Sequence, residues 1–292
     1  MSSARVAATD SIAREAAENA QLEGGSALTC VLAGYFAVVG ASPAVFGAPM
    51  SLLLYGFGAA RALDGRVRQP GTGAKRPRGF SVGTAIPDSA RVAVPTATTA
   101  ALVALGYDRD RRLGQVVQAG IRTAKAAGAE GRVRLLEAVK NGGAGAFTDP
   151  MLHRPWLHVA GQGQGGMLTA ADFSLVADVD KAAERQGSRL RVGWDNQAYD
   201  TESGVIGAVD RQGAGAILIY APLRGGLEIT GWDVLAPMSA APIVRGKPRT
   251  RPGTFLPAAA PIEIELDPSG KLAAIGTTRP PSAGAPLFRL TP

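Results

Sequence analysis

The amino-acid sequence predicts an α+β fold in which antiparallel sheets lie between helical layers. Helical patterns dominate the first half of the chain, paired strand patterns dominate the last third, and one apolar strand pattern interrupts the early helices. A regular βαβ alternation, which a parallel sheet would need, is absent. A chain of 292 residues with 46% hydrophobic and 19% charged residues can bury a core of this kind.

The first two helices are predicted close to the N-terminus. Ser11 can cap a helix whose apolar positions Ile12, Ala16 and Ala20 recur at helical spacing, and a Gly-Gly pair ends it. Residues 27–39 are apolar on nearly every face, which is typical of a helix buried inside a domain. We therefore expect the second helix to lie in the core.

A central strand is predicted at residues 50–57, where the chain is continuously apolar, with residues 62–66 as its short partner. Residues 69–89 are rich in Pro, Gly and basic side chains and indicate a loop. Further helices are predicted at residues 96–106, 113–127 and 131–140.

Two hairpins are predicted in the last third of the chain. Residues 205–220 place a polar Arg-Gln-Gly turn between two apolar runs, and residues 262–275 do the same around Asp-Pro-Ser-Gly. We expect the two hairpins to be neighbours in the core of the sandwich.

The net charge of +7 is concentrated in three clusters, at residues 61–78, 109–112 and 245–251. No stacking aromatic residues and no nucleic-acid-binding motif accompany them, so a nucleic-acid partner is not expected. A solvated basic surface explains the clusters, and a basic scaffold protein that binds an acidic partner is the alternative. A homo-oligomer or another protein partner is a separate expectation.

A cytoplasmic protein without a membrane span is expected. The single cysteine, Cys30, cannot form an internal disulfide, and Gly and Pro interrupt the longest apolar stretch, residues 27–54. The N-terminus lacks the apolar core of a secretory signal. His153 and His158 are five residues apart and do not share a helical face, so neither a metal nor another cofactor is expected.

Several segments, in the same order along the chain, resemble motifs of the gamma-glutamyltransferase family. They are GGSALTCVLAGYFAVV (24–39), RALDGRVRQP (61–70), VAVPTATTAALV (92–103), GAFT (145–148), GGMLTAADF (165–173), SGVIGAVDRQGAGA (203–216) and AAAPIEIELDPSGKLAAIG (258–276).

The resemblance implies an αββα sandwich of the N-terminal-nucleophile hydrolase type. Only residues 174–202 separate two motifs that the family spaces by a long helical region, so a truncated version is expected. The whole chain, residues 1–292, would form one domain, with 1–202 resembling the family's large subunit and 203–292 its small subunit.

The resemblance also implies site residues. Ser203 aligns with the family's nucleophilic Thr, at which the chain would cleave itself, and Thr201 is the alternative if two residues are inserted. Arg66 matches the Arg that binds the substrate carboxylate, and Asp233 could match the acid that contacts the substrate α-amino group.

Three family features are altered. Neither candidate nucleophile is followed by the family's Thr-His pair, Pro257 and Ala258 replace a substrate-binding Ser-Ser pair, and Pro280 and Pro281 fall near the Gly-Gly oxyanion donors. Two functions are therefore open. One is transfer or hydrolysis of a γ-glutamyl group from an amide such as glutathione, after autocleavage. The other is a catalytically silent relative that binds a small molecule or a partner.

Overall fold

The structure is a computed structural model of residues 1–292 that describes all of them except 1–3, 75–78, 109–112, 175–177 and 195–201. The α-helices are α1 (Ser11–Leu22), α2 (Ala27–Ala41), α3 (Ala97–Ala104), α4 (Leu113–Ala126), α5 (Glu130–Gly142) and α6 (Pro150–Ala160). The strands are β1 (Arg5–Ala8), β2 (Met50–Tyr55), β3 (Arg61–Gly65), β4 (Asp180–Ala182), β5 (Glu184–Gln186), β6 (Arg189–Arg191), β7 (Gly204–Val209), β8 (Gly215–Tyr220), β9 (Leu227–Ile229), β10 (Val234–Ala236), β11 (Ile262–Leu266), β12 (Leu272–Thr277) and β13 (Arg289–Leu290). Short 3-10 helices are η1 (Asp88–Arg91), η2 (Leu105–Tyr107), η3 (Gly143–Thr148), η4 (Gln162–Gln164) and η5 (Ala170–Phe173).

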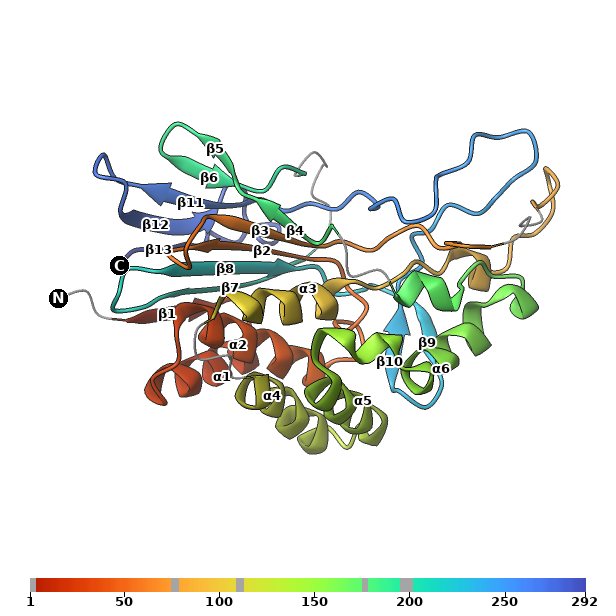
Figure 1. Cartoon of the computed structure of the whole chain (residues 1–292), viewed down its shortest axis with the longest axis horizontal. Helices are drawn as coiled ribbons and strands as arrows, with labels where there is room; N and C mark the ends of the chain where they lie inside the picture. The colour runs from red at the N-terminus through yellow and green to blue at the C-terminus, as the bar shows by residue number, and fades with distance from the viewer. Residues whose placement is uncertain (1–3, 75–78, 109–112, 175–177, 195–201) are drawn as a thin grey trace.

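The described elements form three layers: helices, a first sheet and a second sheet (Figure 1). The first sheet has the order β1-β7-β8-β2-β3-β4, and the second has the order β13-β12-β11-β6-β5. All pairings between these strands are antiparallel, as predicted. A separate small hairpin joins β9 to β10.

Both predicted hairpins are present and face each other across the sandwich. β7 pairs with β8 and β11 pairs with β12, and the second hairpin contacts β8. The central strands β7, β8 and β2 are largely apolar on both faces because both faces of the sheet are covered there. Along β2, Leu53 packs between the two sheets, whereas Leu52 and Leu54 pack against the helices.

Helix α2 lies buried at the centre of the helical layer, where it contacts α1, α4, β7 and β8. Two glycines bring α2 and α4 together. A Cβ atom on Gly40 would lie 2.0 Å from the Gly120 carbonyl oxygen, and one on Gly120 would lie 2.5 Å from the Phe36 carbonyl oxygen. The uniformly apolar sequence of α2 is explained by this position.

Two details of the predicted helices are corrected. The side chain of Asp10, not Ser11, caps α1 by accepting hydrogen bonds from the Ile12 and Ala13 amides. The buried face of α1 consists of Ala13, Ala17 and Ala20, while Ile12 is 38% exposed. The cap therefore comes one residue earlier than predicted, and the apolar face is rotated.

No helix covers the outer face of the second sheet in the described part of the chain, so a helical layer is missing from the αββα arrangement. Alternate residues of β11 point outward there as Glu263 and Glu265. Glu263 pairs with Arg191 at 2.9 Å, and Glu265 pairs with Arg289 at 2.7 Å. A polar, charge-paired surface thus replaces the apolar face that a helical layer would need, which agrees with the predicted truncation.

None of the described helices is long and apolar enough to cross a membrane.

Candidate functional site

Ser203 and Arg66 lie at the same end of the strands of the first sheet, although they are far apart in the sequence. Gly204 pairs with Tyr220, Tyr220 pairs with Met50, and Met50 pairs with Gly65. Ser203 precedes this row of paired residues and Arg66 follows it. Because neighbouring strands are about 4.8 Å apart, the two ends of the row are roughly 14 Å apart.

The surroundings of Ser203 are unusual for a nucleophile. Its backbone N–H donates to the Pro281 carbonyl oxygen at 2.9 Å, and its Oγ is buried without a hydrogen-bond partner in the described structure. The segment that the resemblance aligns with the oxyanion donors therefore does lie beside Ser203. This segment, however, offers the Ser203 amide a carbonyl acceptor. Proline has no N–H, so Pro280 and Pro281 cannot donate to an oxyanion.

Tyr220 lies directly against the start of β7. A Cβ atom on Gly204 would be 2.0 Å from the Tyr220 ring, so only glycine fits there. Burial raises the pKa of the Tyr220 phenol well above its usual range, and the nearby charge of Asp10 adds to this. Tyr220 therefore stays protonated near neutral pH and cannot act as a general base for Ser203.

Arg66 is held by a fully buried carboxylate. Its Nε and Nη2 atoms donate to the two oxygens of Asp64 at 2.9 and 2.8 Å. Lys181, on β4, donates to the same carboxylate at 2.7 Å. The Asp64 side chain is 0% exposed, whereas those of Arg66 and Lys181 are 13% and 37% exposed. One anion thus joins two cations, so this cluster has an excess positive charge.

Two aromatic rings wall the cluster. The Arg66 guanidinium carbon lies 5.3 Å from the centres of both the Trp194 and Phe255 rings, and Lys181 Nζ lies 4.9 and 4.7 Å from them. The Trp194 indole N–H donates to Ser51 Oγ at 3.0 Å, which fixes that ring. We call Asp64, Arg66, Lys181, Trp194 and Phe255 the Arg66 cluster.

Asp233 has partners of its own in the described structure. It lies in the β9–β10 turn with a positive φ of 51°, and its Oδ2 accepts from the Gly131 amide at 2.7 Å. Arg132 donates to the Asp233 carbonyl oxygen at 2.9 Å. These bonds tie the turn to the start of α5, and none of them involves Arg66 or Ser203. The resemblance also predicts that Arg66, Ser203 and Asp233 line one cleft, and this stays a prediction. Thr201 lies outside the described residues.

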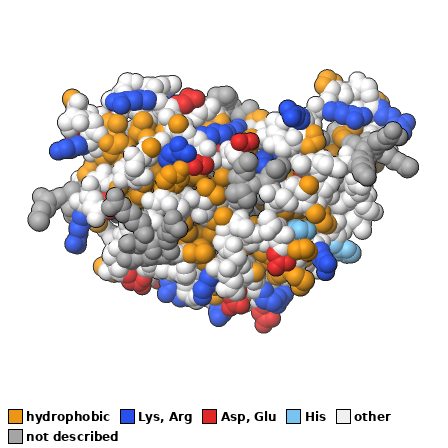
Figure 2. Space-filling model, in the orientation of Figure 1, with side chains coloured by type: hydrophobic (Ala, Val, Ile, Leu, Met, Phe, Trp, Pro, Cys, Tyr) orange, Lys and Arg blue, Asp and Glu red, His pale blue; other side chains and the backbone are white. Residues whose placement is uncertain are grey.

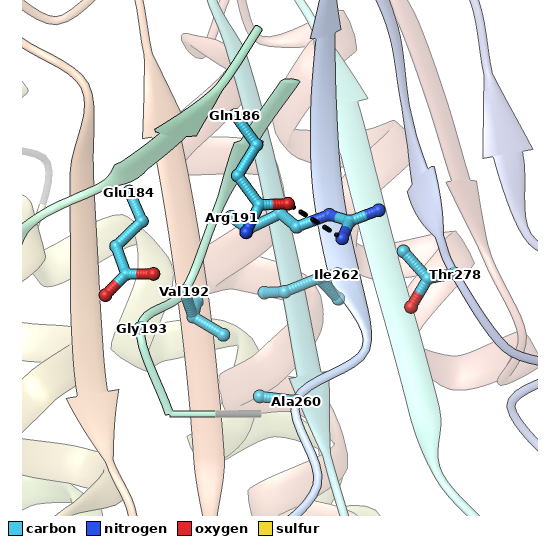
Figure 3. Close-up of a pocket in the computed structure, with 8 residues that line it drawn as sticks. All are labelled: Glu184, Gln186, Arg191, Val192, Gly193, Ala260, Ile262 and Thr278. Carbon is cyan, nitrogen blue, oxygen red and sulfur yellow. Dashed lines mark hydrogen bonds between the residues drawn. The ribbon is translucent and has the colours of Figure 1, made fainter. Parts of the chain in front are cut away.

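A pocket of about 160 Å³ opens at the edge of the second sheet (Figure 3). Glu184, Gln186 and Arg191 give it polar groups, and the Arg191 guanidinium donates to the Gln186 side-chain oxygen at 3.2 Å. Thr278 also lines it. Arg66, Ser203 and Asp233 are not among its lining residues, so this pocket is distinct from the predicted site.

The two histidines lie on α6, whose helical pattern is hidden in the sequence by Pro155 and by the neighbouring glycines. His153 is buried, stacks on Phe173 and contacts the Phe147 carbonyl oxygen through Nδ1. Within the described ranges, no group of three or more His, Cys, Asp or Glu side chains is arranged to hold a metal ion.

Sequence reasoning did not find Lys181, Trp194 or Phe255. They come from separate segments and meet only because β4 pairs with β3 and because residues 254–256 lie beside residues 67–69. To find these residues from the sequence, one would have to predict that β4 pairs with β3. The strand β4, which supplies Lys181, has only three residues, too few to show a strand pattern.

Comparison with solved structures finds chains of similar fold. A structure of LmbA2991 matches with a TM-score of 0.63 at 14% identity, covering 94% of this chain and 78% of that chain. Cephalosporin acylase from Bacillus halodurans matches with a TM-score of 0.62 at 11% identity, covering 94% and 77%. Gamma-glutamyltranspeptidase from Helicobacter pylori matches with a TM-score of 0.51 at 16% identity, covering 63% and 68%.

At such low identities, this likeness establishes the fold. No protein-family model matches the sequence, and no curated protein is significantly similar to it. The predicted fold, a shortened sandwich of the N-terminal-nucleophile hydrolase type that resembles gamma-glutamyltransferases, is confirmed by these structural matches.

Proposed function

We propose that this chain, which has the N-terminal-nucleophile hydrolase fold, binds a small carboxylate-bearing molecule of the γ-glutamyl kind at the Arg66 cluster and lacks ordinary γ-glutamyltransferase turnover. The observation that carries the binding proposal is the excess positive charge of Asp64, Arg66 and Lys181 beside two aromatic rings. A buried carboxylate that holds a guanidinium in place also orients it for a ligand.

Arg66 keeps donors for such a ligand. Asp64 occupies Nε and Nη2, while Nη1 makes no hydrogen bond in the described structure. A ligand carboxylate that binds Nη1 would be close to the Lys181 ammonium and would neutralise the extra cation. The Trp194 and Phe255 rings would exclude water on either side, which strengthens the electrostatic attraction.

One feature argues against turnover. The Pro281 carbonyl oxygen accepts a hydrogen bond from the Ser203 amide, in the segment where an oxyanion would need N–H donors, and proline has none to offer. Losing one oxyanion donor from a working enzyme already costs about a hundredfold or more in rate.

The binding proposal is tested by calorimetry with L-glutamate and a γ-glutamyl amide. Arg66→Gln should weaken binding about tenfold or more, because a hydrogen bond to a charged group contributes about 1.5–3 kcal/mol. Arg61→Gln is the matched control, because Arg61 begins the strand β3 that Arg66 follows, but it pairs with Asp180 at a partly exposed position outside the Arg66 cluster. Equal affinities for the two variants, or no binding by the wild type, would contradict the proposal.

One observation favours a second function. Ser203 directly precedes the central strand β7, its Oγ is buried and has no hydrogen-bond partner in the described structure, and it lies at the same end of the first sheet's strands as Arg66. This arrangement supports autocleavage before Ser203, followed by transfer or hydrolysis of a γ-glutamyl group. Thr201 remains the alternative nucleophile by sequence.

Denaturing electrophoresis with intact mass separates the two functions. We expect one uncut chain and no release of a chromogenic amine from a γ-glutamyl amide. Two fragments of roughly 200 and 90 residues, together with turnover that Ser203→Ala or Thr201→Ala abolishes, would establish the enzyme instead.

A further inference from the structure

A basic arm projects from one end of the molecule, formed by residues 79–87 and 241–253 (Figure 1). The two segments lie side by side. The Phe80 amide donates to the Ile243 carbonyl oxygen at 2.8 Å, and the Arg245 amide donates to the Phe80 carbonyl oxygen at 2.9 Å. Neither segment contains an Asp or a Glu.

Four exposed cations lie at alternate positions on this arm: Arg245, Lys247, Arg249 and Arg251. Their side chains make no hydrogen bond or ion pair with any other described residue. The arginines of the second sheet behave differently, since Arg191 and Arg289 pair with Glu263 and Glu265. Figure 2 shows Lys and Arg side chains on the projecting end, with no acidic side chain beside them on that face.

The arm has a fixed base rather than a free backbone. Gln69 is 1% exposed, and its side chain both donates to the Ala241 carbonyl oxygen and accepts from the Ala241 amide, each at 2.9 Å. Its backbone exchanges two more hydrogen bonds with Gly253 and Thr254. One buried glutamine therefore fixes both ends of the segment that carries the four cations.

We propose that this arm is a docking surface for an acidic polypeptide segment, bound by Arg245, Lys247, Arg249 and Arg251. A row of cations without local carboxylates attracts an oppositely charged chain and lowers the cost of ordering it, because the arm is already held. Carboxylates at short intervals along an extended peptide match cations at alternate positions. Lys75, Arg76 and Arg78 directly precede residues 79–87 in the sequence, but they lie outside the described residues.

A polypeptide is favoured over a nucleic acid by the side chains that are missing from the arm. Proteins that hold single-stranded nucleic acid combine cations with aromatic platforms for the bases. The arm has one aromatic residue, Phe80, and it is only partly exposed. Between its cations the arm carries Gly, Pro and Thr, which offer no ring for stacking.

The test measures fluorescence anisotropy of a labelled decaglutamate peptide, with a labelled oligothymidylate of equal charge as the competing class of ligand. The arm variant is Arg245→Gln, Lys247→Gln, Arg249→Gln and Arg251→Gln combined. The matched control removes the same number of exposed cations elsewhere, as Arg122→Gln, Lys125→Gln, Arg154→Gln and Arg211→Gln. Thermal melting of both variants checks that they fold.

We expect the arm variant to bind decaglutamate at least tenfold more weakly than wild type and the control variant to change less than threefold. Raising the salt from about 50 to about 300 mM should weaken wild-type binding strongly. Equal losses in the two variants would mean that net charge alone attracts the peptide and would overturn the proposal. Tighter, arm-dependent binding of the oligothymidylate would also overturn it, because the partner would then be a nucleic acid. Absence of peptide binding by wild type would have the same consequence.

Discussion

At the scale of single residues, Gly204 decides how closely Tyr220 approaches the start of β7. In Gly204→Ala the new methyl group would meet the Tyr220 ring at 2.0 Å, inside a strand that is buried throughout. Overpacking of this kind costs about 1–3 kcal/mol, so we expect that loss in the free energy of unfolding measured with urea.

Gly106→Ala is the control for this substitution. Nothing lies within 4 Å of a Cβ atom at Gly106, which is exposed and has no positive φ. Its free energy of unfolding should therefore change by less than about 0.5 kcal/mol. Similar changes in the two variants would show that the contact with Tyr220 does not limit position 204.

The buried carboxylate of Asp64 gives a second prediction at this scale. Asp64→Asn removes the only anion of the Arg66 cluster and leaves Arg66 and Lys181 to repel each other. Because both cations are partly exposed, we expect a loss of about 2–3 kcal/mol, below the 3–5 kcal/mol of a fully buried pair. The measurement is the midpoint and slope of urea unfolding.

Glu265→Gln is the matched control, since its partner Arg289 has a side chain that is 59% exposed. An exposed ion pair contributes about 0–1 kcal/mol, so this variant should be nearly neutral. If Asp64→Asn lowered the free energy of unfolding as little as Glu265→Gln does, solvent would already screen the charges of the Arg66 cluster from one another.

The sequence predicted part of the candidate site and missed the rest for a physical reason. Arg66 and Asp64 are two residues apart and belong to one short motif, RALDGRVRQP (61–70), which is recognisable in the sequence. Trp194, Phe255 and Lys181 have no motif of their own, and they reach Arg66 only through tertiary contacts. The bond between the Ser203 amide and Pro281 is likewise a product of the folded chain.

At the scale of elements, long or strongly patterned segments were predictable and short ones were not. The two hairpins, the buried helix α2 and the strand pair β2–β3 follow from apolar runs and turn residues. β4, β5, β6, β9 and β10 have three residues each, too few to show a period. Helix α6 was missed because Pro155 lies inside it, where proline is ordinarily unfavourable.

The tie between the β9–β10 turn and α5 gives a prediction for Asp233. Its carboxylate satisfies the Gly131 amide in the first turn of α5, so Asp233→Ala should lower the free energy of unfolding by about 1–2 kcal/mol. Asp233→Asn should cost less, because asparagine keeps an acceptor oxygen and tolerates the positive φ.

Calorimetry with the γ-glutamyl ligand distinguishes this structural role from the one expected from the sequence. If Asp233 only ties the two elements together, affinity at the Arg66 cluster should stay within about twofold in Asp233→Asn. If Asp233→Asn bound the ligand tenfold more weakly at an unchanged free energy of unfolding, Asp233 would be part of the binding site.

At the scale of the whole molecule, the two parts of the chain on either side of residue 203 are interleaved. β7 and β8, from the later part, lie between β1 and β2 of the earlier part in the first sheet. Expressed separately, residues 1–202 and 203–292 should therefore each lack a cooperative unfolding transition, and an equimolar mixture should regain one. Circular dichroism during thermal unfolding is the measurement. A cooperative transition of residues 1–202 alone would show that the helical layer folds without the central hairpin.

The interleaved strand order also constrains how a ribosome can make this protein. β1, β2 and β3 leave the exit tunnel early, yet the first sheet cannot close until the hairpin that fits between them has been translated. At about 5–20 residues per second, the roughly 150 residues between β3 and the end of β8 take about 8–30 s to synthesise. During that time the nascent chain exposes the unpaired edges of β1 and β2 and the apolar faces of α2. A chaperone that shields the growing chain should therefore raise the yield of folded protein more than any surface substitution.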